Sequence, residues 1–326
     1  MTNPIITICI ANYNKGPYIK ECLDSIIKFE NIENIEIIIV DDCSNDNSKE
    51  IIKNWIDNNK EIKIIFNENK ENKGPGYTYN QTIKKSNGEF ITFMDSDDFF
   101  ILSTLDEKRK KLLKNPDFKI IYGNGTFYEN NILSGLSIHK NIFNTFKFFD
   151  NDTSKILENI YCKVPLLSIS SSLIRKDFLQ ETGGFDEEIF SNDWVLNIKI
   201  FQKLRDKNYF SIDENIAFGY RIYENNISKN YDKILSMLSE VIEKYCPEKL
   251  KNIGYSNIYF TNSLSNLSIG NYKKAFSSIK KSLKYKFKIN KIIVFIIAFL
   301  IPKKLLNMIP KKSLNKIKSF ILKKFQ

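Results

Sequence analysis

The chain has 326 residues, enough for one large domain or for one domain with an appendage. Apolar residues make up 42% and charged residues 27%, a balance that is typical of a globular body and argues against a multi-pass membrane protein. The net charge is +11, but residues 249–326 hold eighteen lysines and no acid, so residues 1–248 are net acidic. An acidic body joined to a basic tail implies two surfaces with different partners.

Cysteine and histidine are sparse. The five cysteines include no C-x-x-C pair, which argues against a zinc knuckle or a disulfide framework, and His139 is the single histidine. A histidine-dependent triad is therefore improbable. The first residues lack a basic segment leading into an apolar stretch, so we expect the folded body in the cytoplasm.

Residues 1–120 alternate between apolar runs of strand length and segments with helical spacing. The predicted strands are Ile5–Ile10, Ile35–Val40, Ile62–Phe66 and Phe90–Met94. Helices are expected from Pro17, around Ile51–Ile56 and over Tyr77–Lys85. This alternation predicts an α/β fold with a mostly parallel, Rossmann-like sheet and flanking helices.

Polar residues follow three of these strands. They are Ala11, Asn12 and Tyr13 after the first, Asp41 and Asp42 after the second, and Asp95, Ser96, Asp97 and Asp98 after the fourth. In open sheets of this kind ligands bind beyond the carboxyl ends of the strands, so we expect these loops to meet at one edge.

The acidic loop at residues 95–98 places carboxylates close enough to repel one another, which a divalent cation would relieve. Mg²⁺ or Mn²⁺ fits an all-oxygen set, and such an ion typically bridges protein carboxylates to a diphosphate. The alternative is a solvated acidic turn or a helix cap. The position directly after an apolar strand favours the metal site.

Beyond residue 119 the pattern is less regular until about residue 224, and residues after about 230 are expected to be helical. We therefore divide the chain into a catalytic-type domain over 1–230 and a helical C-terminal region over 231–326 that ends in a lysine-rich amphipathic tail.

The ordered set of motifs over residues 4–230 resembles the inverting family 2 glycosyltransferases, whose fold class is called GT-A. The matching stretches are Ile8–Asn14, Leu23–Ile26, Ile37–Ser44, Asn72–Gly74, Asn80, Gly88–Ile91, Phe93–Asp98, Gly183–Glu187, Asn192–Asp193, Tyr220–Arg221 and Asn226–Ser228. Each motif is weak alone, but their order and spacing are specific.

The resemblance implies roles for residues around the donor. Positions implied to bind the nucleotide sugar are Ala11, Asn12, Tyr13, Asp42, Lys73, Asn80, Asp95 and Ser96, with Asp97 and Asp98 at the metal. Tyr13 would stack on the base, and Asp42 would accept a hydrogen bond from a uracil-like or thymine-like edge. Lys73 would touch the diphosphate, unless it is an exposed loop lysine.

The resemblance also makes Asp193 the catalytic base, which would take the proton of the acceptor hydroxyl during direct displacement at the anomeric carbon. A helix N-cap ahead of the apolar residues 194–200 is the alternative, and both roles are compatible. Arg221 and Tyr223 match a late diphosphate loop, although Tyr223 stands where many relatives have histidine and Tyr79 where many have arginine. Residues 202–206 lack the tryptophan of processive synthases, so we expect one sugar per encounter.

The tail contains the ten apolar residues Ile292–Ile301, too few to span a bilayer, which needs about 20. Farther on, Leu314, Ile317, Ile321 and Phe325 form an apolar stripe among lysines. Such helices lie on anionic membrane surfaces, which predicts a peripheral protein on the inner face of the cell membrane. Packing on the body or on a second subunit, as in a homodimer, is the alternative. No nucleic-acid motif is present.

The sequence therefore predicts a non-processive inverting glycosyltransferase that uses a UDP-sugar. A TDP-sugar is the less favoured alternative for the donor. Its acceptor would be a hydroxyl of a lipid-linked glycan or a surface-polysaccharide precursor. The rivals are a nucleotidyltransferase, whose Gly-rich phosphate loop is missing after the first strand, and a catalytically degenerate sugar-nucleotide-binding or scaffold protein.

Overall fold

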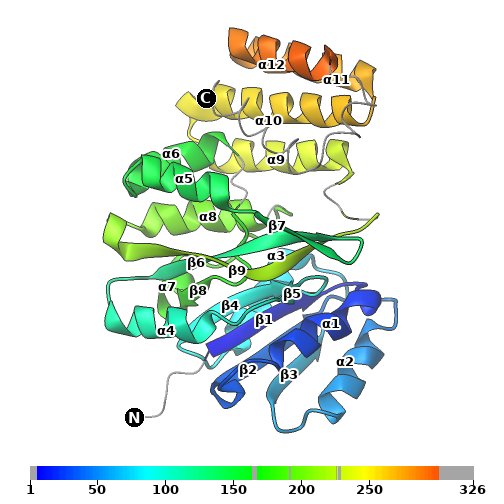
Figure 1. The fold of residues 1–326 in the computed structure, drawn as a ribbon, viewed down its shortest axis with the longest axis vertical. Helices are drawn as coiled ribbons and strands as arrows, with labels where there is room; N and C mark the ends of the chain where they lie inside the picture. Colours follow the sequence, from blue (N-terminus) through cyan, green and yellow to red (C-terminus); the bar gives the residue numbers. More distant parts are fainter. Residues whose placement is uncertain (1–5, 164–166, 191, 225, 227–228, 301–326) are drawn as a thin grey trace. The chain divides into compact units, whose positions relative to one another are not determined.

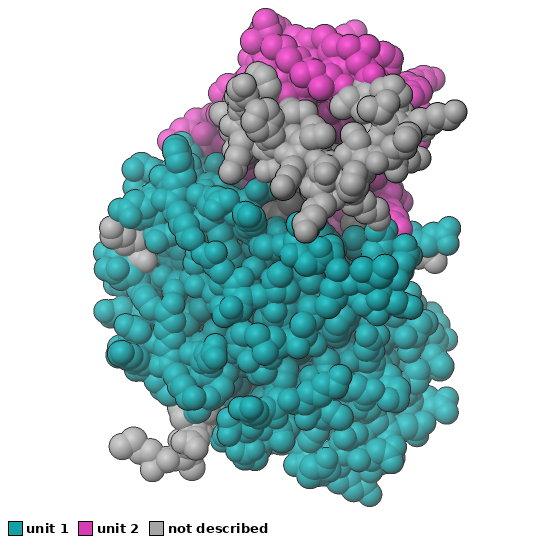
Figure 2. Space-filling model, in the orientation of Figure 1, with its two compact units in different colours: residues 1–160, 165–224 teal, residues 161–164, 225–326 magenta. Residues whose placement is uncertain are grey.

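A computed structural model describes residues 6–163, 167–190, 192–224, 226 and 229–300. These residues form two compact units, of residues 1–160 with 165–224 and of residues 161–164 with 225–326. Figure 2 distinguishes the two units by colour. The predicted tail stripe at residues 314–325 lies outside the described residues.

The first unit is built on one mixed sheet, shown in Figure 1, whose strand order is β3-β2-β1-β4-β8-β6-β9-β5, with β7 beside β6. Its strands are β1 (Ile6–Asn12), β2 (Ile35–Asp41), β3 (Lys63–Glu68), β4 (Phe90–Asp95), β5 (Phe99–Phe100), β6 (Ile120–Glu129), β7 (Ile132–Ser137), β8 (Leu173–Arg175) and β9 (Phe210–Ile222). The strands β3, β2, β1 and β4 run parallel, and β8 pairs antiparallel with β4 and β6. The mostly parallel sheet with flanking helices is confirmed.

Helices connect the parallel strands, as the sequence predicts. The helices of this unit are α1 (Gly16–Ile26), α2 (Ser48–Asp57), α3 (Pro75–Lys85), α4 (Leu105–Lys114), α5 (Lys140–Phe148), α6 (Thr153–Cys162, whose last two residues fall in the second unit), α7 (Lys176–Glu181) and α8 (Asn192–Lys203), with short 3₁₀ turns at Ile32–Asn34 and Lys207–Tyr209. The strands β1, β2 and β4 read as continuous apolar runs because they are buried on both faces. Ile8, Ile10, Ile37 and Ile39 have no exposed surface and belong to the main core.

The middle of the chain is more regular than the sequence suggests. β6 has 10 residues and β9 has 13, and the two pair in parallel over most of their length. Their register shifts near Asn124, where Gly123 and Gly125 interrupt the apolar alternation. The pairing joins residues about 90 positions apart, for example Ile120 with Phe210, which no local pattern reveals.

The second unit is helical. It contains α9 (Tyr231–Tyr245), α10 (Glu248–Ser268), α11 (Tyr272–Tyr285) and α12 (Ile289–Leu300), which Figure 1 shows in yellow to orange. Leu267, Ala275, Ile279 and Phe295 form its small core. Among the described residues, no helix has both the length and the apolar character needed to cross a bilayer.

Candidate active site

The strand register brings the predicted loops to one edge of the sheet. Asn12 pairs with Asp41 across β1 and β2, and Ala11 pairs with Asp95 across β1 and β4. The polar residues that follow β1, β2 and β4 therefore begin at the same level, because parallel strands in register end together.

The loops after β1 and β2 are bonded to each other. The Asn12 side chain donates to Asp41 Oδ2 at 2.7 Å, and the Asn14 amide donates to Ser44 Oγ at 2.9 Å. Asn14 has φ 53° and Cys43 has φ 62°, left-handed conformations that are uncommon outside glycine and that cluster at functional sites. Tyr13, between these anchored residues, is 42% exposed and presents its ring to solvent.

Asp42 is buried and organises the loop after β3. Its Oδ1 accepts from the Asn69 side chain at 2.8 Å and from the Lys73 amide at 2.9 Å, and its Oδ2 accepts from the Gly74 amide at 2.8 Å. The Lys73 ammonium pairs with Glu71 on the exposed loop. A direct contact of Asp42 with a base, or of Lys73 with a diphosphate, stays a prediction.

We expect Asp42→Asn to lower the melting temperature and to weaken protection by UDP. The amide cannot accept all three hydrogen bonds, and an unsatisfied buried polar group costs about 1–3 kcal/mol. Thermal melting with and without UDP measures both effects, with the exposed Asp57→Asn as control. A variant with unchanged melting and an unchanged UDP response would show that Asp42 neither holds the loop nor supports the donor site.

The side chain of Asn80, on α3, is partly buried and is held by hydrogen bonds to a neighbouring turn. Its amide donates to the Phe185 carbonyl at 3.1 Å and to Glu187 at 2.8 Å, and its oxygen accepts from the Phe185 amide at 2.9 Å. These bonds fix the turn at Gly183 and Gly184, whose φ angles of 77° and 62° favour glycine. In this structure Asn80 thus anchors the Gly183–Phe185 turn, and its role in donor binding stays a prediction.

The three acids of the loop after β4 have different surroundings. Asp95 Oδ1 accepts a hydrogen bond from the Tyr79 hydroxyl, and burial together with the charge of Asp97 raises the Asp95 pKa. Asp98 Oδ1 accepts from the Arg221 amide at 2.8 Å. The other oxygen of Asp98 is buried, with no partner in the described part of the chain, and burial holds the pKa of this carboxyl well above its usual range.

The Asp97 side chain is 17% exposed, and its carboxylate meets a cation. Its Oδ2 accepts from the Lys15 ammonium at 2.6 Å and from the Tyr223 hydroxyl at 2.6 Å. Lys15 and Tyr223 also hydrogen-bond to each other, and the Tyr223 ring lies 4.8 Å from the ring of Tyr18. A cation, a phenol and a carboxylate from three distant segments thus meet at this edge.

Arg221 locks β9 onto the acidic loop. Its Nε donates to the Asp97 carbonyl at 2.8 Å, and its terminal nitrogen pairs with Glu21 at 2.7 Å. The guanidinium also lies over three aromatic rings, at 4.9 to 5.2 Å from the centroids of Tyr18, Phe99 and Tyr128. Arg221 is 8% exposed, so in this structure it positions the loop.

Asp193 lies in the first turn of α8. Burial and the charge of Asp95 raise the Asp193 pKa to about 7, while bonds from the Ser168 hydroxyl and the Ile169 amide oppose the shift. A carboxyl whose pKa is close to neutral is suited to accept a proton at physiological pH. The charge of Asp95 contributes to this shift, and the role of Asp193 as the base stays a prediction.

Two contributors escape the sequence analysis. Lys15 follows Asn14 after β1 and contacts Asp97. A basic residue directly after a predicted strand is the feature of the sequence that could have pointed to it. His139 is fully buried, where burial lowers its pKa to about 4, and its Nε2 accepts from the Ser168 amide at 3.0 Å. It thereby positions the residue that bonds Asp193, a link that only the tertiary structure reveals.

The fit of a divalent cation rests on Asp97. In the described part of the chain, no three His, Cys, Asp or Glu side chains form a cluster able to hold a metal ion. Mg²⁺ and Mn²⁺ are commonly bound by one or two carboxylates together with substrate phosphates. Asp97 fits this mode, because the bonds described for it fall on Oδ2, whereas the Asp98 carboxyl is buried against Arg221. The metal role of both acids stays a prediction.

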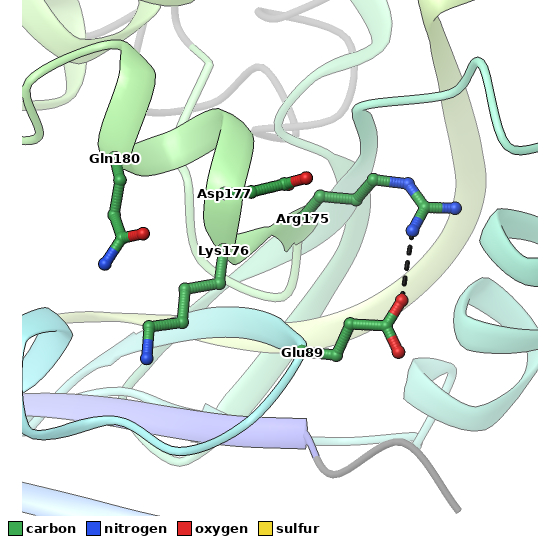
Figure 3. A pocket seen from close by; sticks show the side chains of 5 residues that line it. All are labelled: Glu89, Arg175, Lys176, Asp177 and Gln180. Carbon is green, nitrogen blue, oxygen red and sulfur yellow. Dashed lines mark hydrogen bonds and ion pairs between the residues drawn. The ribbon is translucent and has the colours of Figure 1, made fainter. Parts of the chain in front are cut away.

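A separate hollow of about 340 Å³ lies near the start of β4 and is lined by Glu89, Arg175, Lys176, Asp177 and Gln180. Figure 3 shows these side chains with the ion pair between Arg175 and Glu89, which measures 3.1 Å. The hollow is at the opposite end of β4 from Asp95, so it is not part of the site formed by the strand ends.

The sequence profile described as glycosyl transferase family 2 matches residues 7–183, more than half of the chain. The chain belongs to this family. The matched span contains the loops after β1, β2 and β4 and ends before Asp193 and Arg221, so these late residues lie outside the segment that decides membership.

Several relatives of this chain are named as glycosyltransferases. Glycosyltransferase GlyA of Streptococcus pneumoniae serotype 4 is 27% identical over 257 residues, which cover 77% of this chain and 35% of GlyA. WfgD of Escherichia coli, a UDP-Glc:alpha-D-GlcNAc-diphosphoundecaprenol beta-1,3-glucosyltransferase, is 26% identical over 256 residues, 78% of this chain and 92% of WfgD. An uncharacterized glycosyltransferase of Haemophilus influenzae is 36% identical over 127 residues. The match spans 49% of that protein, so the chain covers half or less of two of these relatives.

Solved structures share the fold. TarS residues 1–349 from S. aureus, in complex with UDP-GlcNAc, gives a TM-score of 0.56 at 18% identity, with 86% of this chain and 81% of that chain covered. The mannosyltransferase PcManGT from Pyrobaculum calidifontis, in complex with GDP-Man and Mn²⁺, gives 0.58 at 14% identity, with 98% and 85% covered. The expected GT-A fold of the family is confirmed.

Proposed function

We propose that this chain transfers one sugar, with inversion, from a UDP-sugar to a hydroxyl of a lipid-linked glycan or surface-polysaccharide precursor. Asp193 acts as the base. The acceptor oxygen forms a bond to the anomeric carbon as its proton passes to the Asp193 carboxylate, and the bond to the nucleoside diphosphate breaks. No protein nucleophile is needed, because the acceptor displaces the diphosphate directly.

The observation that carries this proposal is the meeting of Asp193 with the acidic loop. Both Asp193 and Asp95 are partly buried, and the charge of Asp95 acts together with burial to raise the Asp193 pKa. A base near the acids that the family resemblance implies at the donor and the metal would stand beside the anomeric carbon of a bound donor. The raised pKa of Asp193 matches the requirement for a base that works near neutral pH.

The donor proposal rests on the loops after β1 and β2. The exposed ring of Tyr13 offers a stacking surface, and the loop tied by Asp42 offers polar groups beside it. WfgD, which this chain covers almost completely, is named for a UDP-Glc donor and supports a UDP-sugar. Melting the protein with a panel of UDP-, TDP- and GDP-sugars tests the choice, and protection by a GDP-sugar alone would overturn it.

Mg²⁺ or Mn²⁺ would be held by Asp97, with Asp98 beside it, and when bound would neutralise the charge that develops on the diphosphate. Lys15 and Tyr223 both bond to the Asp97 carboxylate and would act on the same diphosphate. Lys15 holds a positive charge and Tyr223 a donor hydroxyl at Asp97 Oδ2, so both are placed to stabilise a leaving diphosphate.

The charge of the C-terminal region and the names of two relatives support the proposed acceptor and location. WfgD and a Campylobacter jejuni relative, 24% identical over 220 residues, are named for undecaprenol-linked acceptors. The lysine-rich C-terminal region would hold this chain on the anionic inner face of the cell membrane. Attachment of the same region to a second copy of the chain is the competing outcome.

Deleting residues 301–326 should release the protein from membranes. The segment carries eight lysines and no acid, and each lysine near an anionic surface contributes about 1 kcal/mol. Sedimentation with phosphatidylglycerol vesicles measures the release, and donor hydrolysis in solution controls for folding. Equal sedimentation of the full and truncated chains would contradict the proposed tail anchor, and a change from dimer to monomer would favour the second copy.

A further inference from the structure

Helix α12 is apolar on its exposed side as well as on its packed side. Residues 292–300 carry no polar side chain. Val294 and Phe295 are buried, and Phe295 belongs to the small core of the helical unit. The exposed large side chains of the helix, between 37% and 68% exposed, are Ile289, Ile293, Ile296, Ile297, Phe299 and Leu300. A helix that is apolar all round is typical of a protein core or of a membrane, and the described residues supply a core for one side of α12.

Five of the exposed side chains form one stripe along α12, at positions 289, 293, 296, 297 and 300. These spacings keep residues on the same side of a helix. The neighbouring helix α11 widens the stripe (Figure 1), because the Phe299 ring lies 5.8 Å from the ring of Tyr272 and 5.6 Å from that of Phe276. Both of these α11 side chains are about half exposed. We call the combined surface the apolar face: Tyr272, Phe276, Ile289, Ile293, Ile296, Ile297, Phe299 and Leu300.

The charge around the apolar face favours an anionic lipid surface over a second copy of the chain. Lys273 and Lys280 are exposed and lie three residues before and four residues after Phe276, on the same side of α11. Residues 249–326 carry eighteen lysines and no acid, so two copies docked through this face would bring two strongly positive surfaces together. An anionic bilayer has the opposite charge and also takes up apolar side chains.

The length of α12 decides how it can meet a bilayer. The helix has 12 residues, which at about 1.5 Å per residue make about 18 Å, whereas the hydrocarbon core is about 30 Å thick. A helix of this length with one packed side and one exposed apolar side fits the plane of the membrane interface rather than a crossing.

We propose that the apolar face inserts into the acyl-chain boundary of an anionic bilayer, with α12 lying parallel to the surface and the α11 lysines at the level of the headgroups. The proposal rests on the proposed function for the membrane at which the chain works. It adds an apolar attachment to the electrostatic one proposed for residues 301–326, and stable attachment to a membrane generally takes two such contributions.

The test compares two double variants that each remove two neighbouring, exposed apolar side chains. Ile296→Gln with Ile297→Gln alters the apolar face, whereas Ile132→Gln with Leu133→Gln alters β7 in the first unit. Each full-length protein is titrated with vesicles of phosphatidylcholine and phosphatidylglycerol. The titration is done at low salt and at about 1 M salt, where the Debye length is only about 3 Å and the attraction between lysines and lipid is screened.

We expect the wild-type chain to keep part of its binding at high salt, because salt does not screen the apolar contribution. The apolar-face variant should bind about tenfold or more weakly than the wild type at both salt concentrations, since two inserted isoleucines are worth at least that factor. The β7 variant should bind like the wild type. Wild-type binding by the apolar-face variant, or an equal loss in both variants, would overturn the proposal.

A tryptophan placed in the apolar face reports its depth directly. The fluorescence of Ile296→Trp should shift to the blue when vesicles are added and should be quenched by brominated acyl chains. The native Trp55 and Trp194 are buried in the first unit, so the wild-type chain is the control and should show no such quenching. Binding without quenching would mean attachment by charge alone and would overturn the insertion. A blue shift that grows with protein concentration in the absence of vesicles would assign the face to a second copy instead.

Donor hydrolysis without vesicles separates this proposal from the proposed function. The apolar-face variant should hydrolyse the nucleotide sugar at the wild-type rate while losing membrane binding. If no protein hydrolyses the donor but the apolar-face variant still binds vesicles more weakly than the wild type, the proposed function fails and the insertion stands. Normal hydrolysis together with unchanged vesicle binding in that variant sinks the insertion alone.

Discussion

Asp193→Asn should reduce sugar transfer by about 10²- to 10⁴-fold, the usual contribution of a positioned general base. The asparagine has nearly the same shape and can still occupy the start of α8, but it cannot take a proton from the acceptor hydroxyl. Donor binding should persist, because the loops after β1, β2 and β4 are unchanged. Single-turnover transfer and thermal protection by UDP measure the two properties separately.

The pH dependence gives this prediction a second readout. The base acts in its ionised form, so transfer should rise as the pH increases through about 7, the pKa to which burial and Asp95 raise this carboxyl. In the variant the remaining activity should not follow this titration. Full transfer activity in Asp193→Asn, or an unchanged pH profile, would remove Asp193 from the reaction.

Stability should move in the opposite direction from activity. The folded pKa of Asp193, about 7, lies above its ordinary value of 3.8, so the native state holds this proton more tightly than the unfolded chain. The native state therefore loses stability as the pH rises from about 4 to about 7. Asp193→Asn removes that loss, and its melting temperature should exceed that of the wild type at pH 8, with a smaller difference at pH 5.

Asp97→Asn should lower donor turnover by about a hundredfold or more, since a Lewis-acid metal contributes several kcal/mol to stabilising the departing charge. Asp97 is the acid of the loop whose carboxylate is partly exposed and bonds to Lys15 and Tyr223. Turnover of the wild-type enzyme should fall after chelation and return with Mg²⁺ or Mn²⁺. The variant should show a much weaker response to added metal.

A matched substitution controls for the general loss of one negative charge. Asp106→Asn, on α4, removes an acid that pairs with Arg109 and Lys110 away from the strand-end edge, and it should leave turnover within about twofold. Unimpaired hydrolysis in Asp97→Asn would remove the metal role of Asp97. If the wild type shows no metal-dependent hydrolysis, the alternative of a catalytically degenerate sugar-nucleotide-binding or scaffold protein is favoured.

Lys15 provides a further comparison for Asp97. Because the Lys15 ammonium already contacts the carboxylate, a positively charged side chain and a divalent cation compete for the same group. Lys15→Met should leave Asp97 more available, so the concentration of metal needed for half-maximal turnover should fall while the maximal rate also falls. A lower metal requirement with an unchanged maximal rate would show that Lys15 only occupies the carboxylate.

The sequence by itself determined the parallel part of the fold and its polar edge. Buried parallel strands require long apolar runs, and β1, β2 and β4 carry them and then turn polar at Asn12, Asp41 and Asp95. Because parallel strands end together, the loops that follow had to meet at one edge. Family membership followed from the same motifs, since their order along the chain is specific.

The tertiary structure decided what each acid touches. Asp97 and Asp98 are neighbours in sequence, yet one carboxylate meets Lys15 and Tyr223 while the other is buried against the Arg221 amide. The difference arises because β9 returns to the acidic loop from more than 100 positions away, and no local pattern encodes that return. The burial that raises the pKa of Asp193 likewise depends on segments that only folding brings together.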